Sequence, residues 1–303
     1  MRALLPAALL AALSCGPARD SSPAEARAVR FLAREVPQWA AKNKCFSCHN
    51  NGDAARALLV ARRRSIPFDP AVLESTLRWL RRPEGWDDNG PKVEFSDKKL
   101  ATLQFAHALS VAVPPGDPAL IRAAERVSAL QEKDGSWAVD SDGLPGSPVT
   151  YGRTLATAVA RHIYLSADPA RFAPAADAAQ RWIADRNPAG VLDAAALLLG
   201  GRRDPDECLE ILRRGQSRDG GWGPFVTSPP EVFDTSVALL ALMSRIDRPG
   251  VPEMVRRGRE FLVGMQEADG SWPETTRPHG ADSYAQRIST TGWALLALLS
   301  VPD

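Results

Sequence analysis

The chain has 303 residues, of which 45% are hydrophobic, and its formal net charge at pH 7 is +1. That charge balance, with no basic stripe interleaved with aromatic residues, argues against nucleic acid as a partner. The chain is long enough to bury a large core, and its Ala-, Leu- and Arg-rich composition with only 3 Tyr favours helix.

The first residues have the pattern of a secretory signal. Met1-Arg2 is a short basic start, and residues 3–13 form an apolar run that is too short to span a membrane permanently. Cys15 then stands where a bacterial lipoprotein carries its lipidated cysteine, although Ala12 replaces the usual Leu three residues before it. Ordinary signal cleavage after Ser14 is the alternative.

We therefore expect three segments, a signal peptide over 1–14, a tether over 15–24 and a single domain over 25–303. The domain would lie in the periplasm or at the cell surface, held at the membrane by a lipid anchor on Cys15. In such an oxidising compartment c-type haem is attached and disulfides persist.

The next feature along the chain is Cys45-Phe46-Ser47-Cys48-His49, a C-x-x-C-H motif. Two thiols at that spacing can each add to a haem vinyl group, and the adjacent imidazole can coordinate the iron. The motif predicts one covalent haem c, bound through Cys45, Cys48 and His49. A Cys45–Cys48 disulfide, a partial zinc site and a redox dithiol remain as alternatives.

Further along, one pattern occurs three times, as QEKDGSW over 131–137, QSRDGGW over 216–222 and QEADGSW over 266–272. Each copy follows one amphipathic helix and precedes another, and residues 82–86 form a weaker copy. In each copy the Gly can take a positive φ in a tight turn, and the Trp can donate its indole N–H to a loop carbonyl. The Gln can cap backbone groups at the helix end. We expect these segments to be stabilising corners between helices.

The repeat predicts six helix pairs, near residues 25–64, 70–112, 117–166, 174–201, 205–246 and 251–300. The second helix of each pair is the more apolar, so we expect these helices to form an inner ring and the first helices an outer ring. Six such pairs can close into an all-α structure, an α/α toroid in which the sixth pair abuts the first. The C-x-x-C-H motif would occupy the loop of the first pair.

The Gln-x-x-Asp-Gly-[Ser/Gly]-Trp repeat resembles the QW motif of the squalene/oxidosqualene cyclase and protein prenyltransferase superfamily, over residues from about 70 to 303. The resemblance implies the toroid and an apolar small molecule in its cavity. Class II cyclases protonate their substrate with the middle Asp of Asp-x-Asp-Asp-Thr-Ala. The matching run, 231–236, has Phe233 at that position, which cannot donate a proton. Prenyltransferases bind zinc through Asp, Cys and His, and the comparable run, 149–154, lacks both Cys and His.

The chain also resembles bacterial secreted proteins that carry a C-x-x-C-H motif within such repeats. That resemblance brings no assigned activity with it.

A haem bound by His49 needs a second axial ligand or an open site. His279 lies in the loop of the sixth pair, at the same end of the toroid as the motif, and is the leading candidate; Met265 is the second. A solvated loop histidine is the alternative for His279. Cys208 lies on an apolar helical face and is expected to be a buried structural thiol.

Several polar residues fall near the same end of the toroid and are either cavity residues or ordinary turn and helix-cap residues. They are Asp97, Tyr151, Asp193, Asp234 and Tyr284. We assign no catalytic residue, because no Ser/His/Asp set or phosphate-binding loop is recognisable.

The sequence therefore predicts an exported haem-binding toroid with a redox or electron-transfer role and a redox partner protein. One alternative is a cyclase-like or prenyltransferase-like enzyme that acts on an apolar small molecule in the cavity. The other is a non-catalytic binding or scaffold module.

Overall fold

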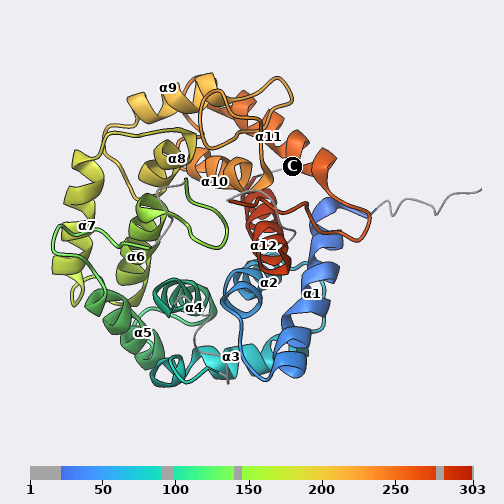
Figure 1. The fold of residues 1–303 in the computed structure, drawn as a ribbon, viewed down its shortest axis with the longest axis vertical. Coiled ribbons are helices and arrows are strands. Elements are labelled where there is room, and N and C mark those ends of the chain that lie inside the picture. The colour runs from blue at the N-terminus through green and yellow to red at the C-terminus, as the bar shows by residue number, and fades with distance from the viewer. Residues whose placement is uncertain (1–21, 90–97, 140–144, 278–282, 302–303) are drawn as a thin grey trace, which may run out of the picture.

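A computed structural model describes residues 22–89, 98–139, 145–277 and 283–301 of the chain. Within these residues twelve α-helices and no strands are found, and the helices alternate between an outer and an inner ring (Figure 1). The outer helices are α1 (Ala24–Asn43), α3 (Glu74–Leu80), α5 (Pro118–Ala129), α7 (Ala173–Asp185), α9 (Asp206–Gly215) and α11 (Val251–Met265). The inner helices are α2 (Ala55–Arg63), α4 (Lys98–Ala112), α6 (Arg153–Ala167), α8 (Val191–Leu199), α10 (Val232–Met243) and α12 (Tyr284–Ser300). The predicted all-α toroid of six helix pairs is confirmed.

Burial explains which helices form the inner ring. Helix α9 is amphipathic and buries only one face, which consists of Cys208, Leu209, Leu212 and Gly215. In the inner helix α10, ten of the twelve residues from Val232 to Met243 are buried. A helix that is buried on all sides must be surrounded by other helices. Helix α10 therefore belongs to the inner ring.

The ring closes where the sixth pair meets the first. The side-chain amide of Gln266, after α11, donates to the backbone carbonyl of Ala24 at the start of α1 at 2.8 Å. Arg259 of α11 pairs with Glu25 of α1 at 2.8 Å. Gly270 has a φ of 92°, and a Cβ there would lie 2.4 Å from the carbonyl oxygen of Arg27.

Each of the repeated corners is stabilised by two side chains, a Trp and a Gln. The indole N–H of Trp137, Trp222 and Trp272 donates to a carbonyl of the preceding outer helix, that of Val127, Leu212 and Leu262, at 2.8, 2.7 and 2.7 Å. The acceptors are helix carbonyls, not the loop carbonyls that we expected, because each ring folds back over the end of its own outer helix. Each Gln bridges two carbonyls, one in its own turn and one at the start of the next outer helix.

The first corner differs from the other corners, and from the loop that we expected there. Residues Cys48–Ala54 form a π-helical turn that runs directly into α2. Ser47 begins this turn, because its hydroxyl accepts hydrogen bonds from the backbone N–H groups of His49 and Asn50. π-Helical turns are rare and occur often at functional sites.

Trp293 lies well within α12, which begins at Tyr284, and is only 2% exposed. In the described ranges, no helix has the length and apolar character needed to cross a membrane.

Candidate functional site

The C-x-x-C-H motif lies between α1 and α2 with its backbone held on both sides. Cys45 and Cys48 are both half-buried. The ring of Phe46 stacks on that of Trp79 with centroids 4.7 Å apart, and the Phe46 N–H donates to the Asn89 side chain at 2.8 Å. The motif is therefore a defined corner of the structure rather than an exposed loop.

His49 faces the last inner helix. Its Nδ1 lies 3.0 Å from the hydroxyl oxygen of Ser289 in α12, and its Nε2 lies 3.6 Å from Sγ of Cys48. Burial lowers the pKa of His49 to about 4, so the imidazole is neutral at ordinary pH. A neutral imidazole has one N–H and one lone pair, the form in which histidine binds metals.

Asp53, at the end of the same turn, is the centre of a buried polar cluster. It is only 1% exposed, accepts a hydrogen bond from the Tyr151 hydroxyl, and accepts another from Gln104 Nε2 at 2.8 Å. Ser289 of α12 also favours the charged form of this carboxyl group. Burial raises the pKa of Asp53, whereas the positive charge of Arg56 and these hydrogen bonds oppose the rise.

Arg56 extends the cluster along the axis of the ring. Its Nη2 lies 3.9 Å from Oδ1 of Asp53, and its Nη1 lies 2.6 Å from Nδ1 of His107. The ring of His162 contacts that of His107 with centroids 5.2 Å apart. Burial and the charge of Arg56 hold the pKa of His107 well below its usual range, so His107 is a neutral acceptor.

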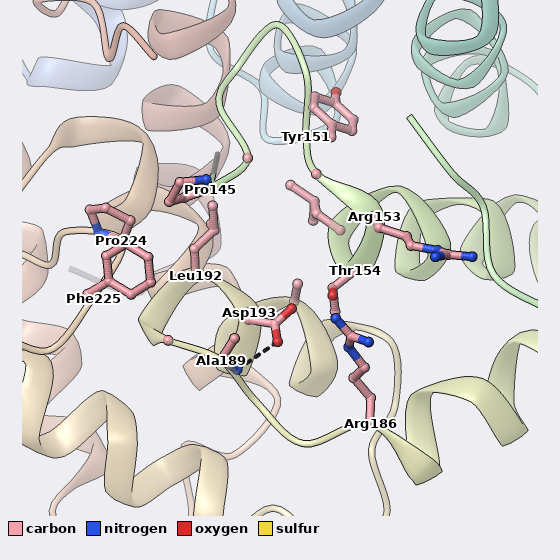
Figure 2. A pocket seen from close by; sticks show the side chains of 15 residues that line it. Pro145, Tyr151, Arg153, Thr154, Arg186, Ala189, Leu192, Asp193, Pro224 and Phe225 are labelled. Carbon is pink, nitrogen blue, oxygen red and sulfur yellow. Dashed lines mark hydrogen bonds between the residues drawn. The ribbon is translucent and has the colours of Figure 1, made fainter. Parts of the chain in front are cut away.

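A pocket of about 300 Å³ opens at the N-terminal ends of α6 and α8 (Figure 2). Leu192, Pro224 and Phe225 form an apolar wall, and Asp193 lies at the polar side, where it accepts the backbone N–H of Ala189 at 2.9 Å. Tyr151 also lines the pocket, so its phenol ring separates this space from Asp53.

The backbone of Tyr151 has a φ of 58°, a left-handed conformation that few residues other than glycine adopt. Such conformations occur where neighbouring contacts enforce them, and they cluster at functional sites. Here the buried ring and the hydrogen bond from its hydroxyl to Asp53 hold the residue in place.

Of the polar residues expected near this end, two line the pocket and two do not. Tyr151 and Asp193 line it. Asp234 is buried in the first turn of α10, but it pairs with Arg277 instead of capping that helix. Tyr284 is 42% exposed, stacks on Trp39 at 5.5 Å and so lies against α1. Asp97 lies outside the described residues, as do Cys15 and His279.

Asp234 lies in a buried ion cluster of its own. Arg277 pairs with Asp234, donates to Glu231 at 3.1 Å and donates to the backbone carbonyl of Gly146 at the edge of the pocket. Burial raises the pKa of Asp234 to about 7, although Arg277 acts in the opposite direction.

The positions of the side chains bear on the alternative that the C-x-x-C-H motif is a partial zinc site. In the described part of the chain, no three Cys, His, Asp or Glu side chains converge where they could hold one metal ion. A structural zinc site needs four ligands around one point, and the described residues alone do not supply such a set around Cys45, Cys48 and His49.

Sequence reasoning missed Ser289, the partner of His49, and Asp53, the partner of Tyr151. It also missed Arg56 and Gln104, which contact Asp53. One signal was available for two of them. Asp53 and Arg56 lie three residues apart at the start of a predicted inner helix, where neighbouring residues are mostly Ala, Leu and Val. Charged side chains in a helix that is expected to be buried need partners.

Comparison with known proteins identifies the fold but does not identify the activity. No family model matches the chain. Lanosterol synthase erg7A of Aspergillus fumigatus is 31% identical over 102 residues, which cover 31% of this chain and 13% of that enzyme.

Solved structures resemble the whole ring. The type II terpene cyclase MstE from Scytonema aligns over 91% of this chain and 98% of its own, with 13% identity and a TM-score of 0.56. A variant of MstE in complex with its substrate, geranylgeranyl dihydroxybenzoate, aligns equally well, with a TM-score of 0.56. A possible GH105-family member from Klebsiella pneumoniae covers 99% of this chain and 98% of its own, with 10% identity and a TM-score of 0.51. At such identities the likeness is one of fold, here a terpene-cyclase-like α/α toroid.

Proposed function

We propose that the protein carries one covalent haem c, bound through Cys45, Cys48 and His49, and serves in extracytoplasmic redox or electron-transfer chemistry. The observation that carries this proposal is the setting of His49. Its Nδ1 lies 3.0 Å from Ser289 Oγ, which leaves Nε2 on the side of Cys48. Histidines that ligate metals almost always have their second ring nitrogen held by such a hydrogen bond.

The other groups around the motif also suit haem. Cys45 and Cys48 are both half-buried, so neither side chain is closed off from a haem bound at this corner. The buried indole nitrogens of Trp39 and Trp79 have no acceptor in the described part of the protein. Both rings belong to this corner, because Trp79 stacks on Phe46 and Trp39 stacks on Tyr284. Haem propionates are acceptors that could pair with such donors.

Bound haem would supply one-electron redox chemistry at its iron. The protein would supply the proximal ligand, His49, and an environment that sets the potential of the iron. We further propose His279 as the second axial ligand and a redox protein as the partner. The export signal and a lipid anchor on Cys15 would place both proteins outside the cytoplasm.

The test is expression together with a haem-attachment system, followed by denaturation and absorption spectroscopy of the protein fraction. Haem should remain with the denatured wild-type chain, and Cys45→Ala combined with Cys48→Ala should remove it. Cys208→Ala is the matched control and should retain it, since Cys208 is buried in α9, away from the motif. A wild-type chain matured in this way that lacks covalent haem would overturn the proposal. A low-spin spectrum that is unchanged in His279→Ala would overturn the assignment of the second ligand only.

The pocket beside Tyr151 favours a second candidate function, the binding of a small organic molecule. Its volume of about 300 Å³ lies at the small end of the usual range for ligand sites. MstE has the same fold and binds a substrate. Here Trp293 and Phe233 fill the ring axis with centroids 5.6 Å apart, and Phe233 stands where a cyclase has its acid. We therefore favour binding of a small amphipathic molecule over cyclisation of a long isoprenoid chain.

An environment-sensitive anionic dye, anilinonaphthalene sulfonate, tests this second candidate. Dye fluorescence should rise on binding to the folded wild-type protein, and Leu192→Trp, which fills the apolar wall, should abolish the rise. Leu165→Trp is the control, because Leu165 is 38% exposed and does not line the pocket. Equal fluorescence in both variants would exclude this pocket as the binding site.

A further inference from the structure

Two side chains of opposite charge line the pocket of Figure 2 without pairing with each other. Arg186 follows α7, Asp193 lies in the first turn of α8, and both contribute to the pocket wall. Neither side chain has an ion-pair partner among the described residues. A cation and a carboxylate that line one cavity unpaired are complementary to a ligand that carries both charges.

The position of Arg186 is held by an aromatic ring. Its guanidinium carbon lies 5.1 Å from the centroid of the Trp182 ring, within the range of a cation–π contact. The Arg186 side chain points toward Thr154 at the start of α6 (Figure 2). The cation therefore lies on the α6 side of the pocket.

The start of α6 adds further donors to this side. Gly152 precedes the helix with a φ of 76°, a conformation that disfavours the Ser or Thr that often caps a helix, and no side chain caps α6. The first N–H groups of a helix have no partner within it and lie at the positive end of the helix dipole. At α8, by contrast, the Pro224 carbonyl accepts from the N–H groups of Val191 and Leu192 at 2.9 and 3.3 Å.

A buried hydroxyl without a protein partner lies at the same place. Thr154 is in the first turn of α6, lines the pocket and is only 6% exposed. Its hydroxyl has no hydrogen-bond partner in the described part of the chain. The hydroxyl of Thr157, further along α6, donates to the carbonyl of Arg153 and accepts from the N–H of Trp137. Buried hydroxyls are normally paired in this way, so the Thr154 hydroxyl indicates a polar ligand atom at the start of α6.

Asp193 provides an acceptor in the same pocket. Its Oδ2 accepts the backbone N–H of Ala189 at 2.9 Å (Figure 2). Its Oδ1 accepts no hydrogen bond from the residues that the structure describes, and the side chain is half-buried. One carboxylate oxygen is therefore available to a donor on a ligand.

We propose that this pocket binds a free α-amino acid with an apolar side chain. The carboxylate of the ligand accepts from Thr154, Arg186 and the first N–H groups of α6, and its ammonium group donates to Asp193. The apolar side chain packs on the wall formed by Leu192, Pro224 and Phe225. An amino acid of this kind is a small amphipathic molecule, so the assignment rests on the second candidate function.

Ligands with a single charge would match the pocket less well. A carboxylic acid without an ammonium group would bring a second negative charge next to Asp193 and leave both unpaired. An amine without a carboxylate would face the cation of Arg186 and the positive end of α6. Like charges brought together, and polar groups that a ligand desolvates without pairing, both reduce affinity. A zwitterion pairs both charges of the pocket.

The experiment compares three probes in ligand-observed NMR titrations of the full chain. L-Phenylalanine carries both charges, 3-phenylpropionate lacks the ammonium group, and 2-phenylethylamine lacks the carboxylate. We expect the wild type to bind L-phenylalanine at least about tenfold more tightly than either of the other two, the usual effect of losing a hydrogen bond to a charged group.

Substitutions should separate the two charged ends of the ligand. Arg186→Gln and Thr154→Val should each weaken the binding of L-phenylalanine roughly tenfold without weakening that of 2-phenylethylamine. Asp193→Asn should weaken the binding of L-phenylalanine without weakening that of 3-phenylpropionate, and its side-chain oxygen can still accept from Ala189. Arg181→Gln, at an exposed position of α7, is the matched control and should bind all three probes as the wild type does.

A cooperative thermal transition identifies the variants that remain folded. Equal affinity of the wild type for L-phenylalanine and for either single-charge probe would overturn the proposal. Wild-type affinity for L-phenylalanine in folded Arg186→Gln and folded Asp193→Asn would overturn it as well.

The dye titration separates this assignment from the second candidate function. Dye binding that Leu192→Trp abolishes, together with no binding of L-phenylalanine, would overturn the amino-acid assignment and leave the pocket as a binding site. Absence of both dye binding and L-phenylalanine binding would overturn the assignment and the second candidate function together.

Discussion

The guanidinium carbon of Arg56 lies 4.3 Å from the centroid of the Trp293 ring, so the first and the last inner helices meet through a cation on an aromatic face. Both residues are buried, with exposed fractions of 4% and 2%. Tyr151 and Phe233 pack edge-on against the same indole, with ring centroids 5.5 and 5.6 Å away. The axis of the toroid is thus filled by side chains from four of its six units.

Arg56 should be essential to this axis because it is the cation nearest to the buried carboxylate of Asp53. We expect Arg56→Met to lower the free energy of unfolding at pH 7 by about 3–5 kcal/mol, the usual effect of leaving a buried charge without its partner. Urea denaturation measures this. The double variant Arg56→Met/Asp53→Asn should recover part of the loss, since it leaves no unpaired charge. If the single variant loses less than about 1 kcal/mol, Arg56 is not the counterion that stabilises Asp53.

The ring of helix pairs could be predicted from the sequence, but the contacts between side chains along its axis could not. Each Gln–Asp-Gly–Trp corner is a local structure, so the spacing of its residues indicates where helices end. By contrast, Tyr151 meets Asp53 across 98 residues and Ser289 meets His49 across 240 residues, only because six units close into a ring.

Asp234 illustrates the same limit. Local sequence favours a helix cap, because Asp stands near a predicted helix start, but its partner is Arg277, 43 residues further along. The π-helical turn of Cys48–Ala54 also has no periodic signal in so short a segment. The pairing of Asp53 with Arg56 is detectable from the sequence as two charges in a buried helix, although not the identity of their other partners.

Asp234 should make stability depend on pH. Burial raises its pKa to about 7, whereas an unfolded Asp titrates near about 3.9. Between about pH 4 and about pH 7 the folded protein therefore holds a proton that the unfolded chain has lost. A rise in pH through this window lowers the free energy of unfolding, by at most roughly 4 kcal/mol for this one group.

Urea denaturation at pH 5 and pH 7.5 measures that dependence. Asp234→Asn should be less stable at high pH than a simple surface variant, because it loses the contact with Arg277, but its stability should change less between the two pH values. Asp247→Asn is exposed and should keep the wild-type dependence. An identical pH dependence in Asp234→Asn and the wild type would mean that Asp234 is already ionised throughout the window.

Gly270 should be far less replaceable than a glycine in a free turn. Its φ is 92°, and a Cβ would lie 2.4 Å from the carbonyl oxygen of Arg27, at the junction where the ring closes. Gly116 has a similar φ of 80° with nothing within 4 Å of a Cβ. Gly116→Ala should therefore cost only the backbone strain, about 1–2 kcal/mol. Gly270→Ala adds overpacking and should cost roughly 3 kcal/mol or more. Equal losses in chemical denaturation would show that the closure junction can relax.

The three described cysteines should differ in reactivity in the haem-free protein. Cys208 is completely buried in α9, and burial raises its pKa to about 11, so its thiolate is scarce at pH 8. Cys45 and Cys48 are half-buried. Since the thiolate is the species that alkylates, iodoacetamide at pH 8 should modify Cys45 and Cys48 first and should reach Cys208 only after denaturation. Peptide mass spectrometry over time measures the three rates.

In the haem-loaded protein the thioether bonds of Cys45 and Cys48 should block their alkylation, while Cys208 should behave as before. Rapid alkylation of Cys45 and Cys48 in haem-loaded material would therefore contradict covalent attachment, and rapid alkylation of Cys208 in the folded protein would contradict its burial.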